Sequence, residues 1–330
     1  MDQANDANRS AYDPFISLII PVLNEEDAIP FFLNRTSEIL NAANLLFECV
    51  FVDDGSTDRT LDVLLEGVRN DMCIKVVKLS RNFGKEAALM AGIDHAKGEV
   101  LVPIDVDLQD PPELIPQFLA LWREGYDIVY GMRADRQSDS HAKRVTASWF
   151  YRFFNRLSPV KIPENAGDFR LIDQKVAEAL GKLPERNRFM KGLFAWVGFR
   201  SIGVPYDRLP RVAGATKWHY WSLWNFALDG LFSFSTLPLR VWTYLGGLIA
   251  GFAFVYAIFI VARTLISGID VPGYASLITI VLFLGGIHLL SLGIIGEYLG
   301  RLFLEAKGRP LYLVEVVYDS NHDATADRAG

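Results

Sequence analysis

Residues 100–110 read VLVPIDVDLQD, and this stretch decides the fold of the chain. An apolar run over residues 100–104 is followed at once by Asp105, Asp107 and Gln109. An apolar run of this length, bounded by polar residues, is typical of a strand buried inside a parallel sheet. The stretch therefore predicts a strand that ends in a cluster of oxygen-bearing side chains.

The same pattern recurs along the first 130 residues. Further strands are expected at residues 15–22, 47–52, 74–79 and 127–130, and helices at residues 26–43, 57–70, 85–96 and 112–124. Ser56 is the expected N-cap of the second helix. Alternating strands and helices predict an α/β fold with a mostly parallel sheet covered on both faces. In such sheets the ligand lies at the carboxyl ends of the strands.

The residues expected at these strand ends are polar and often acidic. Asp105, Asp107 and Gln109 offer hard oxygen ligands of the kind that Mg²⁺ or Mn²⁺ prefers. No glycine-rich phosphate-binding motif follows the first strand, so another means of neutralising a phosphate is needed. One Asp pair alone is also compatible with a solvated turn. Acidic residues after three of the expected strands favour a bound cation, because carboxylates gathered without one would repel each other.

The chain is also apolar enough to enter a membrane, with 51% hydrophobic residues and a mean hydropathy of +0.18. Residues 241–263 and 274–296 are expected to form two transmembrane helices joined as a hairpin. Lys and Arg are concentrated outside the hairpin rather than in its connecting turn, so both termini are expected on the cytoplasmic side. Residues 1–14 are polar, resemble no signal peptide and are expected to be flexible. The sequence thus predicts an integral protein of the cytoplasmic membrane.

Charge is distributed unevenly along the sequence. Residues 1–130 carry a net charge of −13, residues 131–217 carry +9 and residues 218–330 carry −2. A basic block directly before apolar sequence suits an anionic membrane surface or a phosphorylated ligand, and the acidic first segment argues against nucleic acid. Residues 142–157 combine aromatic and basic residues, and residues 217–240 are rich in aromatic residues with few charges. Both segments are expected to lie at the membrane interface. The alternative is that they belong to the core of the domain.

Six motifs in this order resemble those of the family 2 glycosyltransferases, and more narrowly those of the polyisoprenyl-phosphate glycosyltransferases. They are PVLNE at residues 21–25, DDGSTD at 53–58, RNFGK at 81–85, DVDLQDPPE at 105–113, GDFRL at 167–171 and RVAGATK at 211–217. The resemblance covers about residues 15–310. It implies a GT-A fold: a cytoplasmic catalytic domain at residues 15–216, the membrane hairpin, and a C-terminal strand and tail at residues 297–330.

The resemblance also implies a role for each motif. Pro21, Asn24, Glu25, Asp53, Asp54, Arg81 and Lys85 would bind the nucleotide sugar, and Arg211 and Lys217 would close a loop over its diphosphate. Asp107 and Gln109 would hold the metal, with Asp105 supporting the metal or the nucleotide. Arg133, Arg144 and Ser148 would bind the phosphate of a lipid acceptor, although Arg144 also fits ordinary headgroup attraction. Asp168 is a candidate for contacting sugar hydroxyls or acting as a base, and the alternative is a structural pair with Arg170.

The implied reaction transfers a hexose with inversion from a nucleotide sugar, with UDP-glucose preferred, to a polyisoprenyl monophosphate such as undecaprenyl or dolichyl phosphate. A phosphate monoester is largely dianionic at neutral pH, so it needs orientation more than a strong base. The alternatives are GDP-mannose as donor, an Asp-x-Asp membrane phosphatase, a processive polysaccharide synthase, and an inactive partner of another membrane protein.

Residues 310–318, PLYLVEVVY, predict one more strand after the hairpin, because β-branched and aromatic residues dominate it. A lone apolar strand has unpaired backbone groups, so it should join the edge of a sheet. The edge belongs either to its own domain or to a neighbouring copy of the chain. The second possibility is preferred here and would make a homo-oligomer by strand addition.

Overall fold

The computed structural model describes Arg9 and residues 13–70, 73–133, 166–186, 188–207, 237–267 and 273–319. The predicted interfacial helix at residues 142–157 lies outside the described residues, as does the segment at 217–240 except for its last four residues. Arg144, Ser148, Arg211 and Lys217 lie outside them as well.

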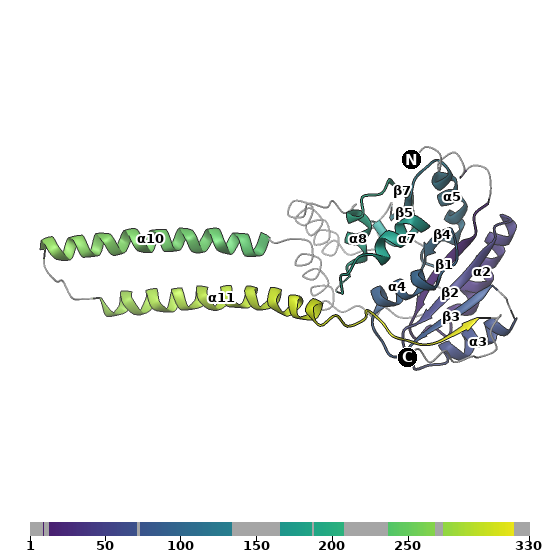
Figure 1. Ribbon diagram of the computed structural model, residues 1–330, viewed down its shortest axis with the longest axis horizontal. Helices are drawn as coiled ribbons and strands as arrows, with labels where there is room; N and C mark the ends of the chain where they lie inside the picture. Colours follow the sequence, from purple (N-terminus) through teal and green to yellow (C-terminus); the bar gives the residue numbers. More distant parts are fainter. Residues whose placement is uncertain are drawn as a thin grey trace.

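The described residues form an eight-stranded sheet with two long helices projecting from the domain that contains it (Figure 1). The strand order is β7-β5-β6-β4-β1-β2-β3-β8. The strands are β1 Ile16–Val22, β2 Phe47–Asp53, β3 Ile74–Leu79, β4 Val100–Pro103, β5 Ile128–Arg133, β6 Ala166–Asp173, β7 Ser201–Tyr206 and β8 Val314–Asp319. Strands β1 to β4 pair in parallel, and β5 pairs in parallel with β7, whereas β6 and β8 are antiparallel to their neighbours. The predicted mostly parallel α/β sheet is confirmed.

Helices cover both faces of this sheet. The domain helices are α2 Ile29–Ala42, α3 Thr60–Asn70, α4 Lys85–His95, η1 Pro112–Leu114, α5 Ile115–Arg123, α7 Gln174–Gly181 and α8 Met190–Trp196. The expected N-cap is wrong: α3 begins at Thr60, and its first backbone N–H donates to the carboxylate of Asp58 at 3.0 Å. Ser56 lies too far before the helix to cap it. Its N–H donates to Asp53, and its Oγ accepts from the N–H of Asn24 in the loop after β1.

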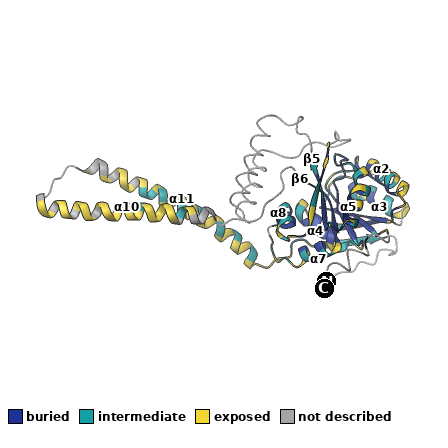
Figure 2. Ribbon diagram, turned by 90° about the horizontal axis from the view of Figure 1, so that it is seen from above, coloured by how far each residue is buried: buried dark blue, intermediate teal, exposed yellow. Residues whose placement is uncertain are grey.

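The side chains along each strand point alternately to the two faces of the sheet, and this divides the core into two layers. In β2, Phe51 packs with Phe32 of α2 and Phe118 of α5 on one face, whereas its neighbour Val50 joins Met90 of α4 on the other. Successive side chains of a strand point to opposite faces, so a strand buried on both sides is mostly apolar. The buried Glu48 is paired with the buried Ser17 and Lys75. Figure 2 shows this buried interior between exposed helix surfaces.

Strand β8 corrects the preference for an exchanged C-terminal strand. It pairs antiparallel with β3 of the same chain, with Val317 opposite Val77. An ion pair between Lys78 and Glu315 at 2.8 Å supports this register. The last strand therefore completes the edge of its own sheet, and strand addition to a neighbour loses its structural basis.

The two projecting helices are α10 Leu237–Ser267 and α11 Tyr274–Ala306. They extend from the domain as a pair, and most of their described side chains are exposed (Figures 1 and 2). Within the described part of the chain, one helical stretch, Thr279–Ala306, is long and apolar enough to cross a membrane, and a shorter apolar helix covers Tyr244–Ile260. The second helix continues ten residues past its expected end at residue 296.

Candidate active site

The loops after β1 and β2 are held together by hydrogen bonds. Asn24 adopts a left-handed backbone with φ of 54°, which Asn tolerates better than most residues. Its backbone N–H donates to Ser56 Oγ at 3.0 Å, and its side-chain Oδ1 accepts from the Thr57 N–H at 2.7 Å. The backbone N–H of Glu25 donates to Thr60 Oγ1 at 2.8 Å. The structure thus brings these two predicted site residues beside the carboxyl end of β2.

Asp53 and Asp54 are both buried and accept backbone hydrogen bonds. Asp53 accepts from the Ser56 N–H at 2.9 Å, which tightens its own loop. Asp54 accepts from the N–H groups of Phe83 at 2.7 Å and Gly84 at 2.9 Å, and so ties the end of β2 to the loop after β3. Burial raises the pKa of Asp54, although these two donors act against the shift. In this arrangement Asp54 positions a loop, and its contact with a nucleotide stays a prediction.

Gly55 allows the loops after β2 and β3 to approach closely. Its φ is +78°, and an added Cβ would lie 2.8 Å from the backbone nitrogen of Asn82. Arg81 lies in the same loop, with its guanidinium 4.1 Å from the centre of the Phe83 ring. Its Nη1 donates to the carbonyl of Asn82 at 2.9 Å. These contacts hold Arg81 at the rim of the site while leaving it exposed.

The loop after β4 carries the predicted metal ligands. Asp107 is only 8% exposed and accepts from the Gln109 N–H at 3.2 Å, while the intervening Leu108 has a φ of 54°. A left-handed backbone at a bulky residue is strained and is often found at functional sites. The described residues contain no group of three or more His, Cys, Asp or Glu side chains arranged to hold a metal. One carboxylate and one amide oxygen nevertheless fit Mg²⁺ or Mn²⁺, which commonly bind few protein ligands together with substrate phosphates.

Lys85 joins two carboxylates that are far apart in the sequence. Its Nζ lies 2.8 Å from the Asp105 carboxylate and 3.0 Å from Asp168 Oδ2, and its side chain is 41% exposed. Lys191 adds a second cation, 3.6 Å from Asp168 Oδ1. Asp105 is therefore engaged with a lysine, and the metal-binding role of Asp107 stays a prediction.

The two lysines keep Asp168 ionised. Burial would raise the pKa of Asp168, but Lys191 and Lys85 together lower it well below its usual range. For Lys85 itself, burial lowers the pKa, and the two carboxylates raise it by more. A carboxylate with a depressed pKa is a weak base. Asp168 is consequently better suited to contacting hydroxyl groups than to removing protons.

The alternative pairing of Asp168 with Arg170 is not seen among the described residues. The guanidinium of Arg170 donates to the backbone carbonyls of Gly167 at 2.7 Å and Asp168 at 3.3 Å, and lies 3.9 Å from the centre of the Phe194 ring. Burial lowers its pKa to about 10. Arg170 therefore braces the backbone that presents Asp168, and its charge adds to the lowering of the Asp168 pKa without a direct ion pair among the described residues.

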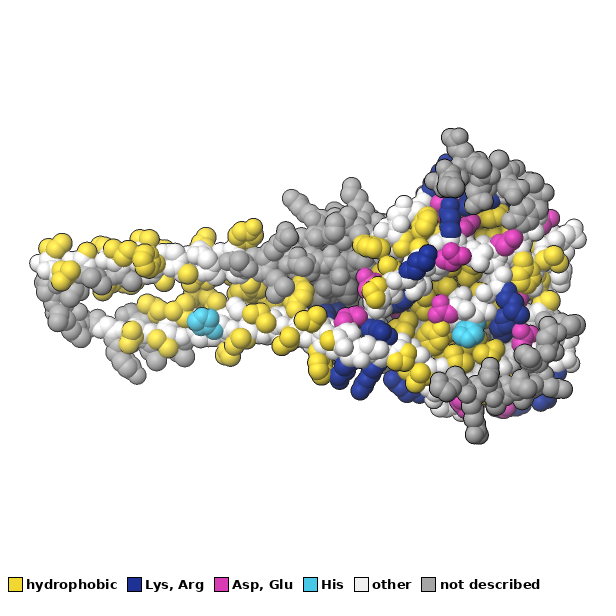
Figure 3. Space-filling view, in the orientation of Figure 1, with side chains coloured by type: hydrophobic (Ala, Val, Ile, Leu, Met, Phe, Trp, Pro, Cys, Tyr) yellow, Lys and Arg dark blue, Asp and Glu magenta, His cyan; other side chains and the backbone are white. Residues whose placement is uncertain are grey.

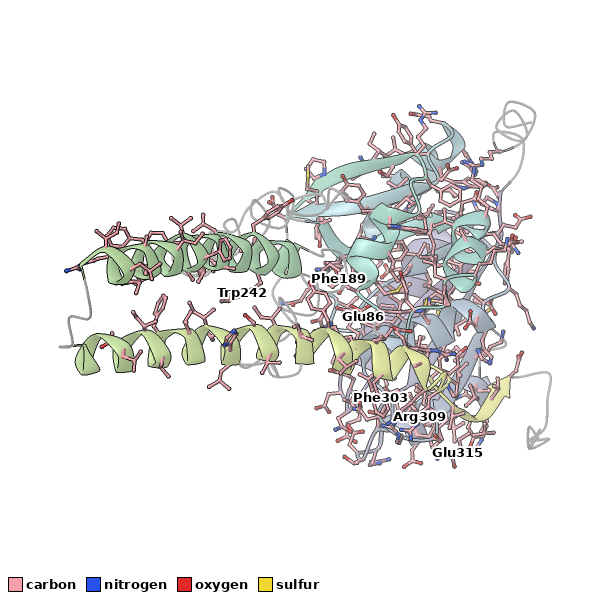
Figure 4. All side chains as sticks on the ribbon, turned by 60° about the vertical axis from the view of Figure 1, so that its left-hand side comes forward. Glu86, Phe189, Trp242, Phe303, Arg309 and Glu315 are labelled. Atoms are coloured by element: carbon pink, nitrogen blue, oxygen red, sulfur yellow. The ribbon has the colours of Figure 1, made fainter. Side chains whose placement is uncertain are left out.

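Sequence reasoning missed Glu86, which follows Lys85 at the start of α4 (Figure 4). Burial raises the pKa of Glu86 to about 7, and the nearby Asp168 adds to the shift, while Lys85 and Lys191 oppose it. Nothing in the sequence distinguishes Glu86 from an ordinary acidic residue in the first turn of a helix. Its unusual environment comes from residues that the fold brings in from elsewhere.

Two further predicted residues, Pro21 and Arg133, also lie on strands. Pro21 is half-buried in β1, opposite Val52 of β2. Arg133 is the last residue of β5, opposite Tyr206. Beside it on the same edge, the Tyr206 hydroxyl donates to the buried carboxylate of Asp110. The roles given to Pro21 and Arg133 stay predictions.

The carboxylates of Asp53, Asp105 and Asp107 lie at or just after the carboxyl ends of parallel strands, where open α/β sheets bind their ligands. The family model for glycosyl transferase family 2 matches residues 17–181, and the model for the GtrB C-terminal hairpin matches residues 237–302. The chain belongs to the family 2 glycosyltransferases and is a glycosyltransferase.

Several relatives match over nearly the whole chain. An uncharacterized glycosyltransferase, sll0501, from Synechocystis is 56% identical over 91% of this chain and 94% of its own length. A bactoprenol glucosyl transferase of Shigella phage SfV is 48% identical over 91% of this chain and 98% of its own length. Among solved structures, a mannosyltransferase from Pyrobaculum calidifontis in complex with GDP-Man and Mn²⁺ is 19% identical, with a TM-score of 0.48 over 90% of this chain and 87% of that one.

Proposed function

We propose that this protein transfers glucose from UDP-glucose to a polyisoprenyl monophosphate, with inversion at the anomeric carbon and release of UDP. The observation that carries the proposal is the Lys85 bridge. It places Asp168, from β6, at the same strand-end edge as Asp105 and Asp107. A site that must hold a sugar beside a diphosphate needs both sets of groups within one pocket.

In the proposed arrangement, the nucleoside lies against the loops that follow β1 and β2. Asn24, Glu25 and Asp53 line this position, and Arg81 stands at its rim. The diphosphate lies toward Asp107 and Lys85, and the hexose lies toward Asp168. Asp168 then accepts hydrogen bonds from sugar hydroxyls, because it stays ionised at neutral pH.

A Mg²⁺ or Mn²⁺ ion held by Asp107 and Gln109, with Asp105 nearby, would neutralise charge on the diphosphate. The chain's own cations have a complementary task. Lys85 offers a positive charge beside the two carboxylates, and Arg211 and Lys217 are proposed to close over the leaving group. Together these side chains would allow the anionic phosphate of the lipid acceptor to approach the anionic diphosphate of the donor.

The acceptor side of the proposal depends on the membrane. We place α10 and α11 across the cytoplasmic membrane as a hairpin, at residues 241–263 and 274–296, with both termini in the cytoplasm. The family model that matches this region is that of a hairpin, and α11 contains a stretch long enough to cross. Arg133, Arg144 and Ser148 are then proposed to orient the lipid phosphate for in-line attack on the anomeric carbon.

The proposed donor and acceptor rest on the relatives named bactoprenol glucosyl transferase, which match at 47% to 48% identity over more than nine-tenths of this chain. GDP-mannose with the same chemistry is the second candidate. An Asp-x-Asp phosphatase is disfavoured, because Gln109 stands two residues after Asp107, where such an enzyme is expected to carry Thr or Val.

Incubating membranes that contain the protein with undecaprenyl phosphate and a panel of labelled nucleotide sugars tests the proposal. Labelled lipid should appear with UDP-glucose and be lost in Asp107→Asn membranes. Asp62→Asn is the matched control, because Asp62 is exposed on α3 and its side chain takes part in none of the bonds described for the site. Label from GDP-mannose alone would reassign the sugar, and release of inorganic phosphate without labelled lipid would support the phosphatase.

A further inference from the structure

A basic groove lies where α11 meets the catalytic domain. The groove has a volume of about 660 Å³, and its lining includes Arg186, Arg301, Lys307 and Arg309 but only one carboxylate, Glu297. Figure 3 shows Lys and Arg side chains gathered at this junction, and Figure 4 places Phe303 and Arg309 at the domain end of α11. No step of the proposed sugar transfer uses these residues.

Three separate segments build the groove and are bonded to one another. Arg301 comes from α11, Lys307 and Arg309 come from the link to β8, and Arg186 comes from the segment after α7. The backbone N–H of Arg186 donates to Glu305 Oε1 at 2.8 Å, and its Nη1 donates to the carbonyl of Arg309. These bonds fix the positions of the cations relative to the helix end.

The charges in the groove are not balanced by its own carboxylate. Arg301 is paired with Glu297 at 2.9 Å, and the Lys307 ammonium lies 4.2 Å from the centre of the Phe303 ring. Neither Lys307 nor Arg309 takes part in a salt bridge with another described residue. Clustered cations of this kind attract a multivalent oxyanion such as a phosphate group.

The groove also has an apolar wall at the end of a candidate membrane span. Phe303, Leu304 and Leu311 line it beside the cations, and the span Thr279–Ala306 ends there. A ligand that fits both parts carries a phosphate next to hydrocarbon. Basic pockets at the cytoplasmic ends of membrane helices are suited to anionic lipid headgroups.

We propose that this groove binds the phosphate headgroup of an anionic membrane phospholipid, with the acyl chains lying along α11. The bound lipid would fix the angle between the helix and the catalytic domain. The inference rests on the part of the proposed function that places α11 in a membrane. It does not depend on which sugar is transferred.

The test measures binding of short-chain phosphatidylglycerol and phosphatidylcholine to the detergent-purified full-length protein by native mass spectrometry. Phosphatidylglycerol should bind more tightly. Each cation near a membrane surface contributes about fivefold in affinity for an anionic lipid. The affinity of the Lys307→Gln/Arg309→Gln variant for phosphatidylglycerol should therefore fall about 25-fold. The control variant Arg69→Gln/Lys182→Gln removes the same charge from exposed positions outside the groove and should bind as the unaltered protein does.

Other outcomes overturn the inference. Equal binding of the two lipids, or an equal loss of phosphatidylglycerol affinity in both variants, would refute the headgroup site. Displacement of the lipid by glycerol 3-phosphate at the same concentration would indicate a site for free phosphate, and displacement by undecaprenyl phosphate at the same concentration would assign the groove to the acceptor. If, in the absence of lipid, the melting temperature of the double variant is lower than that of the control variant, the single variant Lys307→Gln is used instead. Its affinity for phosphatidylglycerol should still fall about fivefold. Unchanged affinity in that variant would also refute the site.

Discussion

Replacing Lys85 with Gln tests whether the bridge between Asp105 and Asp168 organises the site. The change removes a cation that contacts both carboxylates, at 2.8 and 3.0 Å. A hydrogen bond to a charged group contributes about 1.5–3 kcal/mol when it is shielded from water. The Lys85 side chain is 41% exposed, so solvent screening should reduce the loss of folding stability to about 1 kcal/mol.

The effect on sugar transfer should be larger than the effect on stability. With Lys85 gone, the two carboxylates repel each other and no longer present a fixed site for the sugar. Losing one transition-state contact of about 1.5–3 kcal/mol corresponds to a decrease in kcat/KM of about 10- to 150-fold. The assay measures labelled lipid product at varied UDP-glucose, together with the melting temperature of each variant.

A double-mutant cycle and a matched control complete this test. Lys97→Gln removes an exposed lysine whose single carboxylate contact, with Asp319, is long at 3.5 Å, and it should leave transfer unchanged. Combining Lys85→Gln with Asp168→Asn should cost less than the sum of the two single changes, because the residues are in contact. Additive losses, or equal behaviour of Lys85→Gln and Lys97→Gln, would refute the bridge.

Three further predictions concern other parts of the molecule. The carboxyl pKa of Glu86 is raised from 4.5 to about 7, so its contribution to stability is complete below pH 4.5 and is lost as the pH rises to about 7. Glu86→Gln should therefore match the original protein at pH 4.5 and exceed its unfolding free energy by about 1–3 kcal/mol at pH 8 in denaturant titrations, and equal stability at both values would contradict the shift. Ending the chain after Leu313 should remove β8 and cost at least about 2 kcal/mol without changing the oligomeric state, whereas ending it after Asp319 should be harmless; light scattering and thermal melts distinguish these outcomes. Arg144→Ala should raise the KM for the lipid phosphate far more than the KM for the nucleotide sugar, and equal shifts would show that Arg144 is not specific to the acceptor.

The sequence predicted β1 to β5 because these strands are largely apolar. It missed β6 and β7 because neither has that pattern. β6 contains Asp168 and Arg170, whose polar groups are accommodated by lysines and backbone carbonyls that the fold supplies. β7 contains Gly203 and Pro205, and proline is tolerated there because β7 forms the edge of the sheet.

The site could be predicted only where neighbouring residues in the sequence are also neighbours in space. Asp105, Asp107 and Gln109 share one loop, so their clustering follows from the motif. The contact between Lys85 and Asp168 joins residues 83 positions apart, and no local pattern indicates it. The pairing of β8 with its own sheet likewise depends on how far the chain before it can reach, which no local pattern indicates. The link from Lys307 to Leu313 is long enough to reach β3 of the same domain.

The most direct test of the account compares purified protein and its Asp107→Asn variant for transfer of labelled glucose from UDP-glucose to undecaprenyl phosphate. Asp107 is the nearly buried carboxylate that the proposal assigns to the metal and the diphosphate. The account predicts labelled lipid with the original protein and with Asp62→Asn, and a loss of at least about 100-fold in Asp107→Asn at unchanged melting temperature. Transfer by folded Asp107→Asn at the original rate would contradict the placement of the active site at this edge of the sheet.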